Sequence, residues 1–364
     1  MSTTKGLGKH WTIQISRHTG EGRYPRPPQN QRVAPGVGPG LRRGGELFSV
    51  SLVLAVLAAA GLIATAASAQ SANGVSGRLL ADSSGRLLAT GGVSTIEGAG
   101  GGGLSTWALI TGYGTDAQIG ANVHYTGAKT RDYSLQSGGV AIGLYDRVEL
   151  SYANQQFDTN DVLTAISPTL RGYKLKQDVF GVKVRVLGNA VYDQDTWLPQ
   201  VSVGLQYKDN RDATVIPFLN GALAALKPNI KTSGTDFYVA ASKLYLEQSV
   251  LVNGTVRFSK ANQYGLLGFG GPDGHRYRPE FEGSVAYLLR RDFVLGAEVR
   301  AKRGNLKNPA LNLREQAAWD VFVAYFPSKN VSITAAYVDL GEIVGALTAN
   351  RRQGGGYLSL QVGF

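Results

Sequence analysis

Ten charged residues stand on the polar faces of short segments in which apolar and polar residues alternate. Six are basic and four are acidic, and they are Glu149, Lys183, Arg185, Lys243, Arg257, Glu282, Glu298, Arg300, Lys302 and Asp320. If these faces line the inside of a barrel, their field could select solutes by charge. The nearly balanced set could instead form ion pairs that fill a narrow interior. The sequence leaves both roles open.

Counting residues along neighbouring strands, at a rise of about 3.3 Å per residue, predicts two layers of inward ion pairs. Glu149 and Arg185 should pair in a lower layer, near the end of the barrel with the short turns. Arg257, Glu282 and Arg300 should form an upper layer nearer the outer mouth. The layers would either line a pore or brace a closed barrel.

The sequence offers few residues for catalysis or for binding a metal or cofactor. Cysteine is absent, which excludes disulfides, cysteine-based metal sites and a cysteine nucleophile. Residues 98–103 match the glycine spacing of a dinucleotide loop but lack its strand and helix context. His124 and His275 stand on different segments, so a histidine-dependent triad is not expected. The sequence predicts no enzyme, no cofactor, and no catalytic or metal-binding residues.

The elements that must position the charges are strands. From residue 85 onward the chain reads as short alternating segments joined in turn by tight links and long links. This pattern is typical of a transmembrane antiparallel β-barrel, with short periplasmic turns and long external loops. Thirteen clear segments, including 105–113, and a weaker one at 87–97 predict 14 strands. Twelve is the alternative, if weak sequence lies inside as a plug.

The last strand ends on an aromatic residue. Leu358, Leu360, Val362 and Phe364 alternate with polar or small residues, and this ending resembles the C-terminal signal of outer-membrane barrels. The resemblance implies recognition by the outer-membrane barrel assembly machinery.

The N-terminal part divides differently. Residues 1–46 are rich in Gly, Pro and Arg and are predicted to be a disordered or spurious extension. Residues 47–69 combine an apolar run with a small-residue cleavage site, which indicates a cleaved signal peptide. Residues 70–84 would begin the mature chain, and residues 85–364 would form the barrel. The predicted location is the outer membrane of a Gram-negative bacterium.

Several stretches carry a family resemblance: TGYGTDAQIGANVHYT (111–126), GGVAIGLYDRVELSYANQQFDTND (138–161), QDVFGVKVRVLGNAVYDQDTWLPQVSVGLQYK (177–208) and GTDFYVAASKLYL (234–246). They are similar to an uncharacterised proteobacterial outer-membrane family, catalogued only as a domain of unknown function. The resemblance covers residues 85–364 and implies an exported outer-membrane protein. It brings no substrate and no catalytic residues.

The predicted function is therefore porin-like: a pore or transporter for small solutes or hydrophobic compounds. An apolar stretch in a long link, residues 215–226, favours the hydrophobic case, as a short helix in the mouth or a contact with lipopolysaccharide. The alternatives are a closed structural or adhesion barrel acting through its external loops and, less favoured, an outer-membrane hydrolase. Outer-membrane lipid and lipopolysaccharide are the expected partners. Nucleic acid is not, because basic residues are dispersed rather than clustered.

Overall fold

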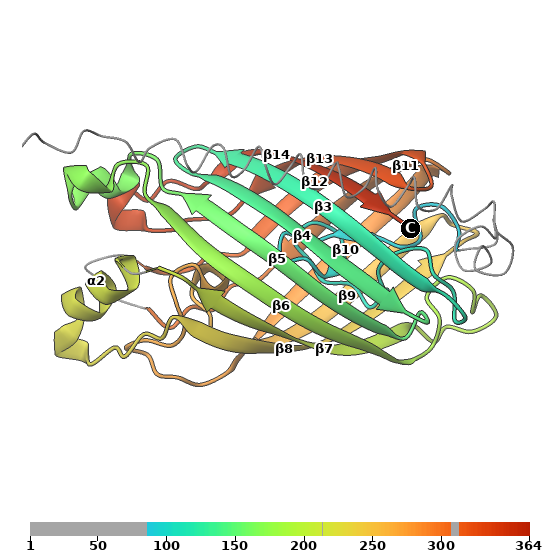
Figure 1. Ribbon diagram of the computed structural model, residues 1–364, viewed down its shortest axis with the longest axis horizontal. Coiled ribbons are helices and arrows are strands. Elements are labelled where there is room, and N and C mark those ends of the chain that lie inside the picture. Colours follow the sequence, from blue (N-terminus) through green and yellow to red (C-terminus); the bar gives the residue numbers. More distant parts are fainter. Residues whose placement is uncertain (1–85, 213, 307–312) are drawn as a thin grey trace, which may run out of the picture. The chain divides into compact units, whose positions relative to one another are not determined.

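Twelve antiparallel strands close into a barrel in the computed structural model, which describes residues 86–212, 214–306 and 313–364 (Figure 1). Each strand pairs with its neighbours in sequence, and β14 pairs with β3 to close the ring. The strands are β3 (Ile119–Thr130), β4 (Ser134–Leu144), β5 (Val148–Asp158), β6 (Lys174–Leu187), β7 (Gln200–Asn210), β8 (Ser233–Tyr245), β9 (Val250–Ser259), β10 (Arg278–Arg290), β11 (Phe293–Arg300), β12 (Ala318–Ser328), β13 (Val331–Asp339) and β14 (Gly354–Gly363). This confirms the predicted all-β barrel.

The two ends of the barrel differ in the length of their connections. At one end, the turn end, tight links such as 145–147, 246–249 and 291–292 join the strands. At the other, the loop end, long links carry the helices α2 (Val215–Ala222), η2 (Val162–Ala165), η3 (Pro168–Leu170), η4 (Ala224–Leu226), η5 (Gln263–Gly265) and η6 (Gly345–Leu347). The expected long link at 127–137 is short, because Ala128 and Lys129 still pair with β4. No helix in the described ranges is long and apolar enough to cross a membrane.

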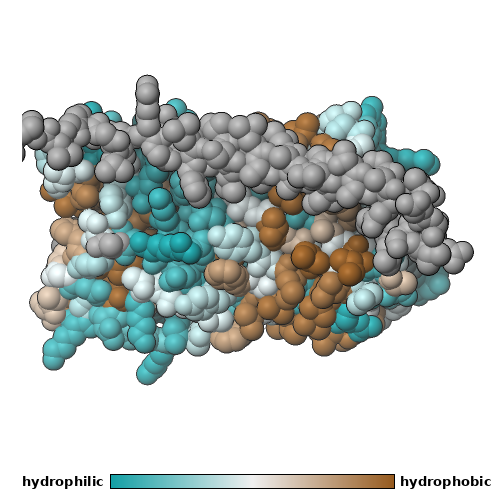
Figure 2. All heavy atoms as spheres, in the orientation of Figure 1, coloured by the Kyte–Doolittle hydropathy of each residue, from teal (hydrophilic) through white to brown (hydrophobic). Residues whose placement is uncertain are grey.

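Alternation determines which residues face outward. Val252 and Phe258 of β9, and Trp319, Val321 and Tyr325 of β12, are large apolar side chains exposed on the outer wall. On the ungreyed part of the face in Figure 2, hydrophobic residues gather over the wall nearer the C-terminal end of the chain. An apolar exterior over polar interior faces is the pattern of a barrel that meets lipid.

The barrel has twelve strands, which is the alternative given for the expected count of about 14. Residues 86–113, here called the plug, lie inside the barrel. Their only strands are the two-residue β1 (Val93–Ser94) and β2 (Gly100–Gly101), which pair with each other. Trp107 and Leu109 belong to the segment 105–113, which was expected to be a wall strand with these apolar residues toward lipid, but both are buried. The plug alternates like a wall strand, but its backbone bonds to inward side chains of the wall.

The C-terminal residues complete the wall at the turn end. Leu358 and Leu360 face outward, as expected. The Phe364 carbonyl accepts hydrogen bonds from the backbone of Tyr113, at the end of the plug, and of Ala121 in β3. The assembly role of this strand stays a prediction. The predicted segments 1–46, 47–69 and 70–84 lie outside the described residues.

Candidate functional site

The plug is held by wall side chains that bond to its backbone. In the lower part, Glu149 accepts hydrogen bonds from the amides of Gly100 and Thr111, both at 2.9 Å. Lys183 donates to the carbonyls of Gly100, at 3.0 Å, and Leu109, at 2.7 Å, and pairs with Glu149 at 3.0 Å. One buried ion pair therefore satisfies four backbone groups of a segment that has almost no secondary structure of its own.

Glu298 holds the glycine-rich part of the plug. One carboxylate oxygen accepts the amides of Gly103, at 2.6 Å, and Leu104, at 2.7 Å. The other accepts the hydroxyl of Ser284 at 2.7 Å, and Trp107 donates its indole N–H to that same hydroxyl at 2.9 Å. A Cβ on Gly102 would overlap this carboxylate, so the wall contact requires glycine there.

Glu97, in the turn of the plug between β1 and β2, lies at the centre of a buried ion cluster. Arg300 approaches its carboxylate at 3.0 Å, and Lys208 donates to it. Arg257 pairs with Glu282 at 2.6 Å, and Arg300 approaches Glu282 at 3.4 Å. Asp236 accepts Lys208 at 2.8 Å, which makes a balanced set of three acids and three bases. Burial alone would raise the pKa of Glu97, but the surrounding basic side chains lower it below its ordinary value.

Of the two predicted layers of ion pairs, the structure contains the upper one and not the lower one. Arg257, Glu282 and Arg300 do come together, as the upper layer required. The lower pair is wrong, because Glu149 stands directly opposite Lys183 in the β5–β6 register. Arg185 lies beyond that register and pairs instead with Asp146 at 2.7 Å. The count from the turns was displaced by two residues.

The other predicted charges lie as follows. Lys302 is buried at the loop end and donates to Gln263 Oε1 at 2.8 Å and to the Leu340 carbonyl at 2.6 Å. Asp320 is buried opposite Glu298. Lys243 does not face the lumen, because it pairs in register with the outward Val252. Its ammonium is covered by the link at 188–199, where it donates to the Leu198 carbonyl at 3.2 Å.

The face of β8 that carries Lys243 therefore points outward, contrary to the prediction. Tyr238 and Ala240 are buried, whereas Phe237 and Val239 are exposed. This error hid Asp236, which lies on the inward face. Lys208 could have been found, since it follows the outward Tyr207. No local signal marks Glu97.

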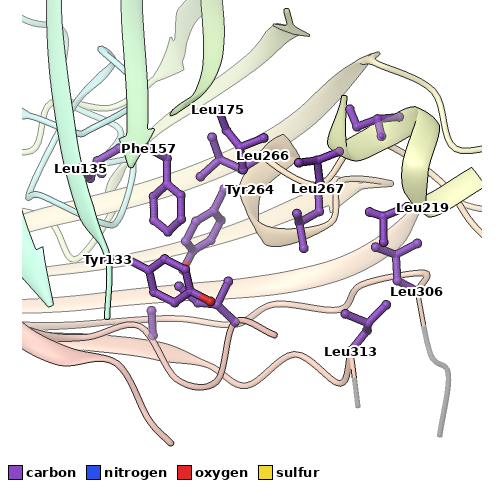
Figure 3. Packing of buried hydrophobic residues seen from close by; sticks show 14 of the residues in the cluster. Tyr133, Leu135, Phe157, Leu175, Leu219, Tyr264, Leu266, Leu267, Leu306 and Leu313 are labelled. Atoms are coloured by element: carbon purple, nitrogen blue, oxygen red, sulfur yellow. The ribbon is translucent and has the colours of Figure 1, made fainter. Parts of the chain in front are cut away.

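Above the ion cluster, at the loop end, the barrel contains two apolar cavities. The outer cavity has a volume of about 120 Å³ and is lined by Tyr133, Phe157, Leu163, Leu219, Leu267 and Leu313, among others. The inner cavity, of about 40 Å³, extends toward Ile96 of the plug. Phe157, Leu175, Leu267 and Ile343 line both cavities. Figure 3 shows the first three of these side chains within the buried apolar cluster. The apolar stretch 215–226 contributes α2, whose Val215 and Leu219 are buried here, in agreement with a helix in the mouth.

Most polar groups beside the inner cavity already bond within the protein, and the Tyr264 hydroxyl is the exception among the described residues that line it. Gln155 donates to the Ile96 carbonyl at 2.7 Å, and Gln263 donates to the Glu342 carbonyl at 3.2 Å. The Glu315 carboxylate accepts a hydrogen bond from the backbone N–H of Gln263 at 2.9 Å. Burial raises the pKa of Glu315 to about 7, although the charge of Lys302 opposes that rise. The cavity walls therefore present mainly hydrocarbon to a ligand.

The raised pKa of Glu315 predicts a pH dependence of stability. Between pH 4.5 and about 7, folded Glu315 keeps a proton that the unfolded chain has released. Raising the pH through this window should therefore lower the free energy of unfolding, and the effect should level off above it. Glu315→Gln should remove this contribution, measured as the difference in thermal midpoint between wild type and variant against pH. A difference that does not change across the window would contradict the prediction.

Comparisons with known proteins give a family and a set of weak structural similarities. The family model described as "Protein of unknown function (DUF3034)" matches residues 90–361, so it includes most of the plug. The chain is similar to a solved KdgM porin, with 10% identity over 67% of this chain and 99% of that one, at a TM-score of 0.42. It is also similar to outer membrane phospholipase A from Escherichia coli, with 11% identity over 70% and 94%, at 0.38.

A third solved structure, the outer membrane protein Omp33 of Acinetobacter baumannii, matches at 9% identity over 69% of this chain and 100% of that one, with a TM-score of 0.35. No curated protein sequence matches the chain. These structural similarities are too weak to carry a function across. The family match spans most of the chain, which therefore belongs to the family described as "Protein of unknown function (DUF3034)".

Proposed function

We propose that this protein is an outer-membrane barrel that binds apolar small molecules at its loop end and admits them to the cell envelope. The observation that carries the proposal is the pair of apolar cavities that lead from the loop end toward the plug. The outer one, at about 120 Å³, approaches the roughly 150 Å³ of an engineered apolar cavity that binds benzene. The apolar outer wall supports the membrane location, with the loop end outside and the turn end in the periplasm.

The plug argues against a permanently open pore for ions. Its backbone is bonded to Glu149, Lys183 and Glu298 on different strands, and its Glu97 completes the ion cluster. In this state the charged interior braces the barrel and is not a field open to passing solutes. We assign passage to a state in which the plug has shifted, and we assign no catalytic step to the barrel.

A filled interior also favours the second candidate, a closed structural or adhesion barrel that acts through its external loops. The two candidates differ in what the cavities do. A structural barrel has no use for a ligand in its mouth, whereas an uptake protein must bind one there with measurable affinity.

The test is binding of toluene, an uncharged molecule close to benzene in size, to the purified full chain in detergent, measured by isothermal titration calorimetry. We expect saturable binding by the wild type and at least tenfold weaker binding by Leu219→Asp. Leu219 is 7% exposed and lines the outer cavity, so a carboxylate there places an ionised group among hydrocarbon. Leu226→Asp is the matched control, because Leu226 belongs to the same link but is 49% exposed and lines neither cavity.

Equal loss of binding in both variants, or no saturable binding by the wild type, would remove the proposal and leave the structural barrel. Both variants must first show the heat-modifiable gel mobility of a folded barrel, so that a folding defect is not mistaken for a lost ligand.

A further inference from the structure

The outer wall of the barrel has a hollow that is larger than either loop-end cavity. It lies across β6, β7, β8 and β9, which are neighbours in the wall (Figure 1), and its volume is about 390 Å³. Its lining is mostly apolar, and the exposed side chains in it include Val182, Val203, Leu205, Phe237, Val239 and Phe258. On a wall that meets lipid, such a hollow accommodates hydrocarbon chains.

The outward residues change from apolar to polar just beyond the hollow, on the side of the loop end. In the strand register, Leu205 lies beside Phe237, and Phe237 lies beside Phe258. One outward position further toward the loop end, Tyr207 lies beside Thr235. Tyrosine directly beyond an apolar band is typical of the boundary between lipid chains and head groups. The hollow therefore reaches head-group level on this side.

A lysine stands at the same boundary. Lys260 follows β9 and is the next outward residue after Phe258. Its ammonium lies 4.2 Å from the centre of the Tyr277 ring, which packs edge-on against Phe237 with ring centroids 5.7 Å apart. Arg276, next to Tyr277, is exposed. Within the part of the chain that the structure describes, no acidic side chain pairs with either cation.

Unpaired cations above an apolar hollow fit a lipid that carries phosphate. Phosphate oxygens accept strong hydrogen bonds from ammonium and guanidinium groups. The stem of Lys260 can lie along apolar surface while its charged end stays among the head groups. With the loop end outside the cell, the leaflet at this height is the outer one, whose lipid is lipopolysaccharide.

We propose that the hollow and the two cations form a binding site for the lipid A part of lipopolysaccharide. An acyl chain would lie against Phe237 and Phe258, and a phosphate would bind Lys260 and Arg276. The inference rests on the membrane orientation given under the proposed function. It does not depend on a ligand in the loop-end cavities.

Native mass spectrometry of the purified full chain tests the site with three lipids: lipid A, lipid A from which both phosphates have been removed, and phosphatidylglycerol. We expect wild type to bind lipid A about tenfold more tightly than the phosphate-free form, the factor that one hydrogen bond to a charged group supplies. Phosphatidylglycerol, with a single phosphate diester, should bind more weakly than lipid A. Lys260→Gln/Arg276→Gln should lose the preference for phosphate.

The hollow is tested separately from the cations. Val203→Trp fills the hollow and should weaken binding of both forms of lipid A. Val321→Trp is its control, because Val321 is exposed on β12 and outside the lining. Lys329→Gln is the control for the cations, since Lys329 lies over the ring of Tyr113 at 5.6 Å but at the turn end. Both control variants should bind lipid A as wild type does.

All variants must first show the heat-modifiable gel mobility of a folded barrel. An unchanged preference for phosphate in the double variant, or equal losses in the control variants, would overturn the inference. Phosphatidylglycerol bound as tightly as lipid A would overturn the assignment to lipopolysaccharide. Toluene binding at the loop end is a separate measurement, so failure of this site leaves the proposed function standing.

Discussion

Glu97→Gln should lower the thermal unfolding midpoint of the barrel and make it conduct ions. The substitution keeps the size of the side chain but removes the carboxylate that Arg300 and Lys208 contact. Three buried bases would then face two buried acids, Glu282 and Asp236. Removing one partner from a buried ion pair costs about 3–5 kcal/mol. Since Glu97 lies on the plug and its partners lie on the wall, much of that loss should weaken the attachment of the plug.

Two variants separate charge balance from simple damage. Glu247→Gln changes an exposed carboxylate at the turn end and should leave both the midpoint and the conductance unchanged. Glu97→Gln/Lys208→Gln restores two acids and two bases, so it should recover part of the lost stability. Planar-bilayer recording and the temperature of the heat-modifiable gel shift provide the two measurements. A Glu97→Gln barrel as stable and as silent as wild type would contradict the assigned role of the cluster.

Glu298→Gln should be the second strongly destabilising change. Its carboxylate accepts the Gly103 and Leu104 amides and the Ser284 hydroxyl, and all of these groups are donors. The glutamine NH₂ would face donors if it pointed at the Gly103 and Leu104 amides. If it pointed at Ser284 it could donate to that hydroxyl, but the two backbone amides would still lose their charged acceptor. Hydrogen bonds to a charged group are worth about 1.5–3 kcal/mol each. Urea unfolding of the purified barrel should therefore show a loss of this order or larger.

Asp320→Asn is the matched control for that experiment. Asp320 lies directly opposite Glu298 in the β11–β12 pair, is equally buried, and its Oδ1 has no hydrogen-bond partner among the described residues. Asparagine keeps the size of Asp320, and no hydrogen bond joins the Asp320 side chain to the plug among the described residues, so stability should stay the same or rise. If the two variants lose stability equally, the effect belongs to the wall in general, and the plug contact has no special part in it.

The wall could be predicted from sequence because it depends on a period of two and on link lengths. Both signals are local, and both were sufficient to place Arg257, Glu282 and Arg300 in one layer. The plug could not be separated from wall strands in this way. Trp107 and Leu109 alternate as a lipid-facing strand would, yet both are buried in a cluster that includes wall residues.

The ion cluster around Glu97 could not be predicted from sequence, for a different reason. Glu97 meets Lys208 across 111 residues of sequence and Arg300 across 203. Such partners are decided by how the plug threads the closed barrel, which no local pattern reports. The cavities could not be predicted from sequence for the same reason, because two of their lining residues, Tyr133 and Tyr264, come from different loop-end links. The sequence pointed only to the apolar stretch that became α2.

Crystals of the full chain grown with 4-bromophenol test the central claim most directly, because anomalous scattering locates bromine without reference to the rest of the structure. We predict a bromine peak in the loop-end cavities beside Phe157 and Leu267, with the plug in place below it. Bromine found only on the lipid-facing wall, or a barrel whose lumen is open where Glu97 and Glu298 should hold the plug, would contradict the account.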